Sequence, residues 1–273
     1  MEPEKHSIII NGRKFFYWEK NPQKKETIIL LHGFPGSHIG LVDIAQTIGN
    51  YRVIVPDLPA CGQSDPLEEK HTLENYSKWL ADFMEHLSLG PAIVIGHSFG
   101  SRVALSFGMH YPKRIKKMVL ITPVLKVDGL IAYFMALHCN IAKLLPGYLR
   151  KQWLSNRLYH KLSHAIIFKS QDMEKRQQIK ERNLKESKHV DHRVTMEIFE
   201  EFYASNLITA GYQVKVKSLI IAGDSDEIVS LSSIEELVGG LAGAKVQIMK
   251  NSGHLLPLEE PVATSDIIQS WLE

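Results

Sequence analysis

Ser98 is the middle residue of a Gly-x-Ser-x-Gly pattern at positions 96–100. The pattern follows a short aliphatic run and precedes a helical one, which is the strand, turn and helix context in which such a serine is exposed and reactive. A serine hydroxyl is a weak nucleophile at neutral pH, so it needs a base and a group that orients the base. His254 and Asp226 provide these residue types, in the chain order Ser, Asp, His. This set favours nucleophilic attack by Ser98 on an acyl carbonyl.

The carboxylate that orients the base has more than one candidate. Asp226 follows the aliphatic run at 218–222, and it is favoured because a residue further from the strand can reach over the sheet edge. Asp224 lies closer to the same strand and competes for this role. Asp128, beyond the aliphatic run at 117–121, is a third candidate.

A second loop has the composition of an oxyanion-binding loop. It contains two glycines and directly follows the aliphatic run at 27–31. Tetrahedral acyl intermediates need preorganised N–H donors, and glycines let backbone N–H groups turn inward. We expect the N–H of Phe34 from this loop and the N–H of Phe99, after the candidate nucleophile, to bind the oxyanion. Pro35 has no N–H, and His32 is interpreted as a structural hydrogen-bonding residue.

Eight short aliphatic runs, bounded by Gly, Pro or Asp, are predicted to be strands. The first two are joined through Asn-Gly, which predicts an antiparallel hairpin. The later ones alternate with helical patterns, which predicts parallel strands with helices on both faces of the sheet. The candidate site residues then follow the carboxyl ends of strands, where open α/β sheets place their sites. The runs lie at 7–10, 14–19, 27–31, 53–55, 92–95, 117–121, 218–222 and 245–249.

Two of the intervening helices carry specific local signals. Thr72 is expected to cap an amphipathic helix that ends before a Gly-Pro pair. In the helix after the candidate nucleophile, Gly100, Ala104 and Gly108 share one face. This stripe of small residues predicts a helix that lies very close to a strand.

The strand pattern stops after the sixth run and resumes only at the seventh, which leaves roughly ninety residues, too many for a structureless loop in a compact domain. Their periodicity is helical. We therefore predict a core domain of residues 1–123 and 212–273 with a helical insertion at 124–211. The insertion has more Lys and Arg than Asp and Glu, which serves solubility or attracts an anionic substrate or membrane surface. Its apolar residues either hold the inserted helices together or line an acyl pocket: Tyr133, Phe134, Met135, Leu144, Tyr148 and Trp153.

Composition narrows the class of protein. The 273 residues are 44% hydrophobic and 23% charged, which allows one large α/β domain with an insertion. A net charge of +2 excludes an acidic disordered chain and a strongly basic nucleic-acid-binding protein. Two cysteines exclude a disulfide scaffold and favour a reducing compartment. The acidic N-terminus lacks secretory-signal features, and the apolar run at 130–137 is too short to span a bilayer. We expect a cytoplasmic protein without a membrane anchor, a metal or another cofactor.

Taken together, these motifs resemble the α/β-hydrolase fold family, with matching features from residue 27 to residue 271. The loop at 57–64 resembles the family's loop after its fourth strand, although Ala60 stands where glycine is common. The resemblance implies an eight-stranded, mostly parallel sheet flanked by helices. It also implies that the insertion after the sixth strand is a cap that covers the site and largely dictates which substrate enters.

Departures from the patterns of particular subgroups indicate the chemistry. Haloalkane dehalogenases and epoxide hydrolases of this fold use an aspartate nucleophile, where this chain has Ser98, and C–C bond hydrolases often have tryptophan in place of Leu255. Proline iminopeptidases usually show a different sequence around the nucleophile. We expect a serine hydrolase that acts on a small or medium carboxylic ester through an acyl-enzyme. A thioesterase or acyltransferase, a C–C bond hydrolase, and a small-molecule receptor that retains the three residues stay open as alternatives.

Overall fold

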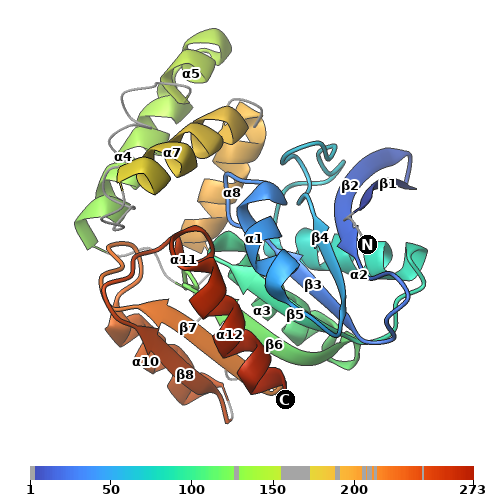
Figure 1. The fold of residues 1–273 in the computed structure, drawn as a ribbon. Coiled ribbons are helices and arrows are strands. Elements are labelled where there is room, and N and C mark those ends of the chain that lie inside the picture. Colours follow the sequence, from blue (N-terminus) through green and yellow to red (C-terminus); the bar gives the residue numbers. More distant parts are fainter. Residues whose placement is uncertain are drawn as a thin grey trace.

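A sheet of eight strands runs through the centre of the molecule (Figure 1). The strands are β1 (Glu4–Ile10), β2 (Arg13–Lys20), β3 (Thr27–Leu31), β4 (Arg52–Pro56), β5 (Ala92–His97), β6 (Ile115–Ile121), β7 (Ser218–Gly223) and β8 (Lys245–Met249). Their order in the sheet is β1-β2-β4-β3-β5-β6-β7-β8. β2 pairs antiparallel with β1 and with β4, whereas the other neighbouring strands pair parallel. The predicted eight-stranded, mostly parallel α/β sheet is therefore confirmed.

The computed structural model describes residues 4–125, 129–154, 173–187, 191–204, 207, 211, 214–241 and 243–273. Each of the eight predicted strands is present in it, and β3 and β8 have the predicted bounds. β5 and β7 continue past their predicted ends to His97 and Gly223, because the chain stays extended up to the turn that follows. These two extensions bring the ends of the strands directly to the candidate site.

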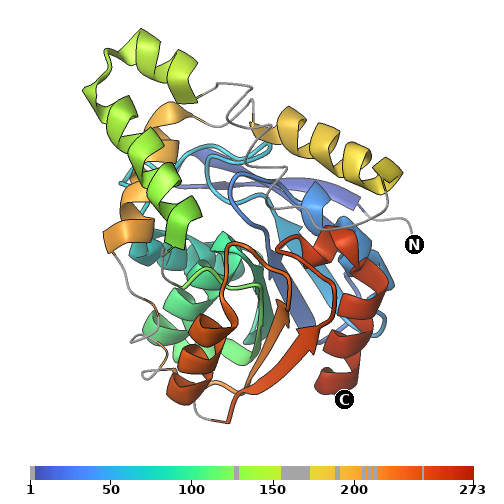
Figure 2. The same ribbon diagram turned by 90° about the vertical axis from the view of Figure 1, so that its left-hand side faces the viewer.

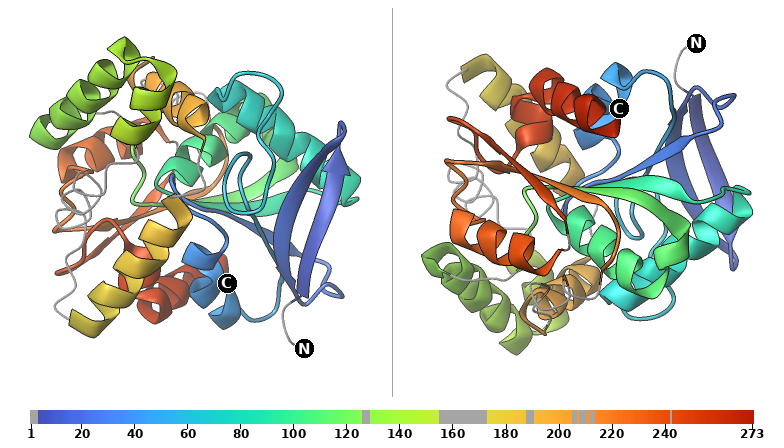
Figure 3. Two further views of the ribbon diagram at one scale, coloured as in Figure 1. Left: turned by 90° about the horizontal axis from the view of Figure 1, so that it is seen from above. Right: turned by 90° about the horizontal axis from the view of Figure 1, so that it is seen from below.

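Helices cover both faces of the sheet (Figure 3). The alternating residues of β3 show the two sides: Ile28 and Leu30 pack on one face, and Ile29 and Leu31 pack on the other. Because both faces are buried, the central strands are aliphatic throughout rather than alternating. One face carries α1 (Ile39–Thr47), α11 (Leu256–Glu259) and α12 (Pro261–Leu272), and the other carries α2 (Leu73–His86), α3 (Phe99–His110) and α10 (Leu231–Gly240), with a short 3-10 turn at Pro112–Arg114.

The local signals in α2 and α3 are confirmed. The Thr72 hydroxyl accepts a hydrogen bond from the N–H of Asn75 at 3.2 Å, so Thr72 caps α2. A Cβ on Gly100 would overlap the carbonyl oxygen of Leu31 at the end of β3. The first turn of α3 can therefore lie against β3 only because residue 100 has no side chain.

The described residues between β6 and β7 form helices and the loops that join them, and none of them lies in a strand. It contains α4 (Gly129–Leu144), α5 (Gly147–Leu154), α7 (Met173–Ser187) and α8 (His192–Ala204). Figures 1 and 2 show these helices at one end of the sheet, the upper end in both views. The domain boundaries at 1–123, 124–211 and 212–273 stay a prediction. Within the described ranges, no helix is both long enough and apolar enough to cross a membrane.

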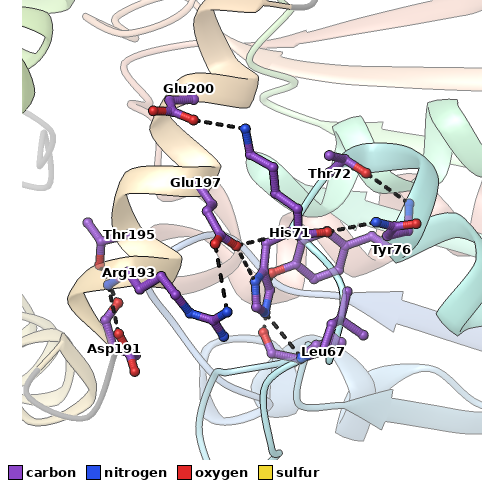
Figure 4. Close-up of polar contacts among 12 residues, drawn as sticks. Leu67, His71, Thr72, Tyr76, Asp191, Arg193, Thr195, Glu197 and Glu200 are labelled. Atoms are coloured by element: carbon purple, nitrogen blue, oxygen red, sulfur yellow. Dashed lines mark hydrogen bonds and ion pairs between the residues drawn. The ribbon is translucent and has the colours of Figure 1, made fainter.

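α8 is joined to the loop before α2 by a buried histidine (Figure 4). His71 is fully buried, and both its Nδ1 and its backbone N–H bind Oε2 of Glu197, at 2.8 and 2.9 Å. Its Nε2 accepts the N–H of Leu67 at 3.2 Å, so the proton of the neutral ring lies on Nδ1. Next to this contact, Lys70 pairs with Glu200 at 2.9 Å. Protonation of His71 would place two N–H groups, its own and that of Leu67, against each other.

We expect Gly100→Ala to destabilise the fold by at least about 3 kcal/mol, because the added methyl group meets backbone that cannot move independently. Gly90→Ala is the matched control: a Cβ at position 90 meets no atom within 4 Å. It should change the free energy of unfolding by less than about 0.5 kcal/mol. Urea unfolding of both variants checks this, and equal stability of the two would contradict it.

We expect stability to fall as the pH drops below about 6.5, the ordinary pKa of histidine. Burial lowers the pKa of His71, and the charge of Arg193 lowers it further, whereas Glu197 and Asp191 raise it. Burial outweighs these two carboxylates, so the pKa lies below its ordinary value. The folded state therefore binds fewer protons there than the unfolded state, and the stability due to neutral His71 is lost with acid. In His71→Asn, the slope of unfolding free energy against pH between 7 and 5 should decrease by up to about 1.4 kcal/mol per pH unit. Identical slopes for the variant and the parent protein would show that this residue has no such effect.

Candidate active site

Ser98 occupies a strained turn between β5 and α3. Its φ is +52°, a conformation that residues with a side chain rarely adopt. The turn is tight, because a Cβ on Gly96 would overlap the carbonyl oxygen of Gly100. The N–H of Ser98 donates to the carbonyl oxygen of Ile121 in β6 at 3.0 Å. The two glycines of the sequence pattern therefore allow the turn, and β6 fixes its position.

The structure brings together the three residues that sequence reasoning placed first. Nε2 of His254 lies 2.9 Å from Oγ of Ser98, and its Nδ1 lies 2.9 Å from Oδ2 of Asp226. An ionised carboxylate only accepts hydrogen bonds, so the Nδ1 proton points to Asp226 and Nε2 is left to accept the serine hydroxyl. Serine and histidine are both buried, with exposed fractions of 8% and 4%. This is the geometry that activation of a serine by a general base requires.

Asp226 is held in its ionised form by its surroundings. Its second oxygen, Oδ1, accepts the backbone N–H groups of Ile228 at 2.8 Å and Val229 at 3.0 Å. Burial by itself would raise the pKa of Asp226, but His254 and these two N–H groups outweigh burial and hold the pKa below its ordinary value. The carboxylate is therefore available at neutral pH to orient the imidazole and to stabilise it when it becomes charged.

The competing carboxylates are placed differently. Asp224 is exposed, and its Oδ1 accepts the N–H of Asn251 at 2.8 Å and the hydroxyl of Ser225 at 2.9 Å. It therefore connects the turn after β7 to the turn after β8, and it is Asp226 that contacts the imidazole. Asp128 lies outside the described residues.

The glycine-rich loop after β3 passes directly beside Ser98. A Cβ on Gly33 would lie 3.2 Å from the Cβ of Ser98. The Phe34 ring meets the Phe99 ring edge to face, with 6.1 Å between centroids. His32 has the expected structural contacts, because its Nε2 accepts the N–H of Leu58 at 2.9 Å and its Nδ1 lies 2.8 Å from the carbonyl oxygen of Gly33. Binding of an oxyanion by the N–H groups of Phe34 and Phe99 stays a prediction.

The loop after β4 is hydrogen-bonded to the loop that follows β3. Asp57 is fully buried and accepts both the backbone N–H and Nδ1 of His38, at 2.7 and 2.8 Å, and the N–H of Gln63 at 2.9 Å. A Cβ on Gly62 would overlap this carboxylate. Ala60 has a φ of +66°, which explains why glycine is common at its position.

The residues of α4 and α5 were expected either to hold these helices together or to line an acyl pocket, and three of them are too exposed to support either role. Phe134 is 56% exposed, Leu144 85% and Tyr148 70%. Trp153 is half-buried, and its indole N–H donates to the carbonyl oxygen of His138 at 3.0 Å, which is a contact between helices. The side chains of Tyr133 and Met135 lie outside the described residues.

Aromatic residues near the site come instead from α8 and α2, and sequence reasoning missed this. Phe202 lies 5.6 Å from Phe99, ring centroid to ring centroid, and Phe199 lies 6.1 Å from Phe202. From the other side, Tyr76 meets Phe99 at 5.3 Å. The signal that could have found them is the helical spacing of Phe199 and Phe202 with their apolar neighbours, which indicates an apolar face but not the segment that this face contacts.

A match to the alpha/beta hydrolase fold family covers residues 26–261. The chain belongs to this family. It is similar to Lipase 1 of Psychrobacter immobilis, with 26% identity over 96% of this chain and 81% of the relative. It is also similar to 2-hydroxy-6-oxononadienedioate/2-hydroxy-6-oxononatrienedioate hydrolase 1 of Pseudomonas putida, with 25% identity over 84% of this chain and 82% of the relative. Among solved structures, the enol-lactonase of Burkholderia xenovorans LB400 has the same fold, with a TM-score of 0.85, 17% identity and coverage of 98% of this chain and 99% of that one.

The hydrogen bonds above predict that Asp226, and not Asp224, controls the reactivity of Ser98. In Asp226→Asn, the amide can hold the imidazole in the wrong tautomer, so we expect fluorophosphonate labelling of Ser98 to slow by about 10³- to 10⁴-fold. Asp224→Asn, in the same loop, should slow it by less than about three-fold, since its side chain binds the neighbouring turn. Mass spectrometry of the labelled peptide measures both rates. The reverse ranking of the two variants would assign the orienting role to Asp224.

Proposed function

We propose that the protein is a serine hydrolase that cleaves small or medium carboxylic esters through an acyl-enzyme, with Ser98, His254 and Asp226 as its catalytic triad. The observation that carries the proposal is the chain of two 2.9 Å contacts from Ser98 Oγ through the imidazole to the Asp226 carboxylate. Two consecutive contacts of this kind go beyond what a binding pocket requires. They therefore favour an enzyme over a receptor that merely retains the fold.

In the first step, Oγ of Ser98 attacks the acyl carbon while Nε2 of His254 takes the hydroxyl proton. The imidazolium that forms is stabilised by Asp226. The carbonyl oxygen becomes an oxyanion, and the N–H groups of Phe34 and Phe99 are proposed to bind it. Phe99 opens α3, so its N–H also brings the positive end of that helix toward the developing charge.

The tetrahedral intermediate then breaks down. The imidazolium returns its proton to the alcohol oxygen as the ester C–O bond cleaves, and the acyl group stays on Ser98. A water molecule, deprotonated by His254, attacks this acyl-enzyme and releases the carboxylic acid. Ser98 regains its proton, and the cycle is closed.

We further propose that the helices between β6 and β7 form a cap over this site. Two contacts support this role. Phe202 of α8 packs toward Phe99, and Ile179 of α7 clusters with Leu255 and Leu258, which closely follow the candidate base. The half-buried rings of Phe34, Phe199 and Phe202 would then give the acyl group an apolar wall.

Hydrolysis of a C–C bond is the second candidate function. It is favoured by the Pseudomonas putida relative, which is a 2-hydroxy-6-oxononadienedioate hydrolase by name. The lipase relative favours esters. Leu255, which stands where C–C bond hydrolases often have tryptophan, also weighs against the second function.

We expect Ser98→Ala to lower kcat on the best ester by at least about 10³-fold, because only substrate binding and the oxyanion donors then contribute to catalysis. The screen should include p-nitrophenyl esters of increasing acyl length, thioesters and a vinylogous 1,5-diketone as the C–C substrate. Ester turnover that is abolished in Ser98→Ala supports the proposal. Full turnover by the purified variant would overturn the assignment of the nucleophile, and turnover of the diketone alone would favour the second function.

A further inference from the structure

The backbone carbonyl of His254 is held by two side chains that the reaction described above does not use. Its oxygen lies 3.0 Å from Nε2 of His97 and accepts the Thr122 hydroxyl at 2.9 Å. Both side chains are buried, with exposed fractions of 8% for His97 and zero for Thr122. The oxygen that they bind belongs to the same residue as the imidazole that faces Ser98.

These two donors stand at the ends of neighbouring strands. His97 is the last residue of β5, Thr122 follows β6 directly, and His97 pairs with Ile121 in the sheet. The same two strand ends position the nucleophile, because Ser98 follows His97 and donates its N–H to Ile121. Nucleophile and base are therefore both fixed to one rigid part of the sheet, although they are 156 residues apart.

Thr122 has an unfavourable backbone conformation for its residue type. Its φ is +41°, a region that glycine and asparagine tolerate and that is a marked outlier for a β-branched residue. A glycine would satisfy the turn, so the turn does not explain why a threonine is present. The hydroxyl, aimed at the carbonyl of His254, supplies a reason for this strain.

His97 is suited to donate a permanent hydrogen bond without carrying charge. A carbonyl oxygen only accepts, so the proton of the neutral ring lies on Nε2. Burial, with a smaller effect of His254, lowers the pKa of His97 to about 3. The ring therefore stays neutral at physiological pH, and it adds no positive charge 5.6 Å from the imidazole ring of His254.

We propose that Thr122 and His97 are positioning residues of the active site: by binding the main-chain oxygen of His254, they keep its imidazole at hydrogen-bond distance from Ser98. This inference rests on the proposed function, in which His254 is the base. The loop around His254 has a further support in Glu259, which accepts the N–H of Gly253 at 3.1 Å. We therefore expect the loop to keep its fold when one of the two donors is removed.

The first test compares Thr122→Val with Thr122→Ser on the best ester. Valine keeps the β-branched shape and loses the hydroxyl, so we expect kcat to fall about 10- to 100-fold with KM changed by less than about two-fold, as for a small displacement of a catalytic group. Serine keeps the hydroxyl and should retain kcat within about three-fold. Thr264→Val is the matched control, because Thr264 is a buried threonine whose hydroxyl lies near Leu256 and Met249 instead. It should leave kcat unchanged.

The second test uses His97→Leu and His97→Gln. Leucine removes the donor, whereas glutamine places an amide N–H near the position of Nε2 and should rescue most of the loss. In the double variant with Thr122→Val and His97→Leu, the loss in kcat should exceed the product of the single losses, because each single variant still leaves one donor on the oxygen.

Several outcomes would overturn the inference. One is a folded Thr122→Val protein with kcat within two-fold of the parent. Another is a Thr122→Ser protein that loses as much kcat as Thr122→Val, which would assign the effect to packing.

A readout that does not depend on activity is the downfield proton resonance of the His254 Nδ1–H group. It should broaden or shift in Thr122→Val and stay unchanged in Thr264→Val, even if no ester is turned over. Absence of ester turnover in the parent protein would defeat the proposed function only, and an unchanged resonance in Thr122→Val would defeat this inference only.

Discussion

The contact between Ser98 and His254 joins residues 156 positions apart, and it depends on a single geometric constraint. Parallel strands with adjacent register end at the same edge of a sheet, so the chain segments that follow β5, β7 and β8 emerge together. No local preference of the chain could hold a serine and an imidazole at 2.9 Å over such a sequence separation. Pairing of the strands, driven by burial of their aliphatic residues on both faces, does so.

At the edge of the sheet where these strands end, backbone segments lie so close together that glycine is required at several positions. Side chains at three positions would collide with main-chain oxygens: Gly96 with residue 100, Gly100 with Leu31, and Gly223 with Ser252. Each of these glycines lies where a strand end, a helix start or a loop meets its neighbour. They are therefore constraints of packing around the site, and they contribute to the chemistry only by permitting the geometry.

Polar groups buried beside the site are paired with main-chain atoms of other segments. The guanidinium of Arg102 in α3 is fully buried and donates to the carbonyl oxygens of Val124 at 2.8 Å, Leu125 at 3.2 Å and, in α8, Glu201 at 3.2 Å. It also stacks over the Phe202 ring, 4.7 Å from its centroid. An unpaired charge would be very unfavourable in this position. This side chain therefore joins α3, the helix that follows Ser98, to the chain segment that follows β6 and to α8.

The sequence alone was enough to predict the secondary-structure elements and the types of residue at the candidate site. Strands and helices follow from short-range periodicity. Ser98, Asp226 and His254 each come shortly after a predicted strand, and parallel strands place these positions at one edge of the sheet. Only the tertiary structure decided between Asp224 and Asp226, since both follow the same strand and the choice depends on how the turn folds. It also placed Phe202 of α8, and not Phe134 of α4, toward the site, and it brought Thr122 and His97 to the carbonyl of His254. These are contacts between segments distant in the chain, and helical or strand periodicity fixes which residues share a face but not which segment that face will meet.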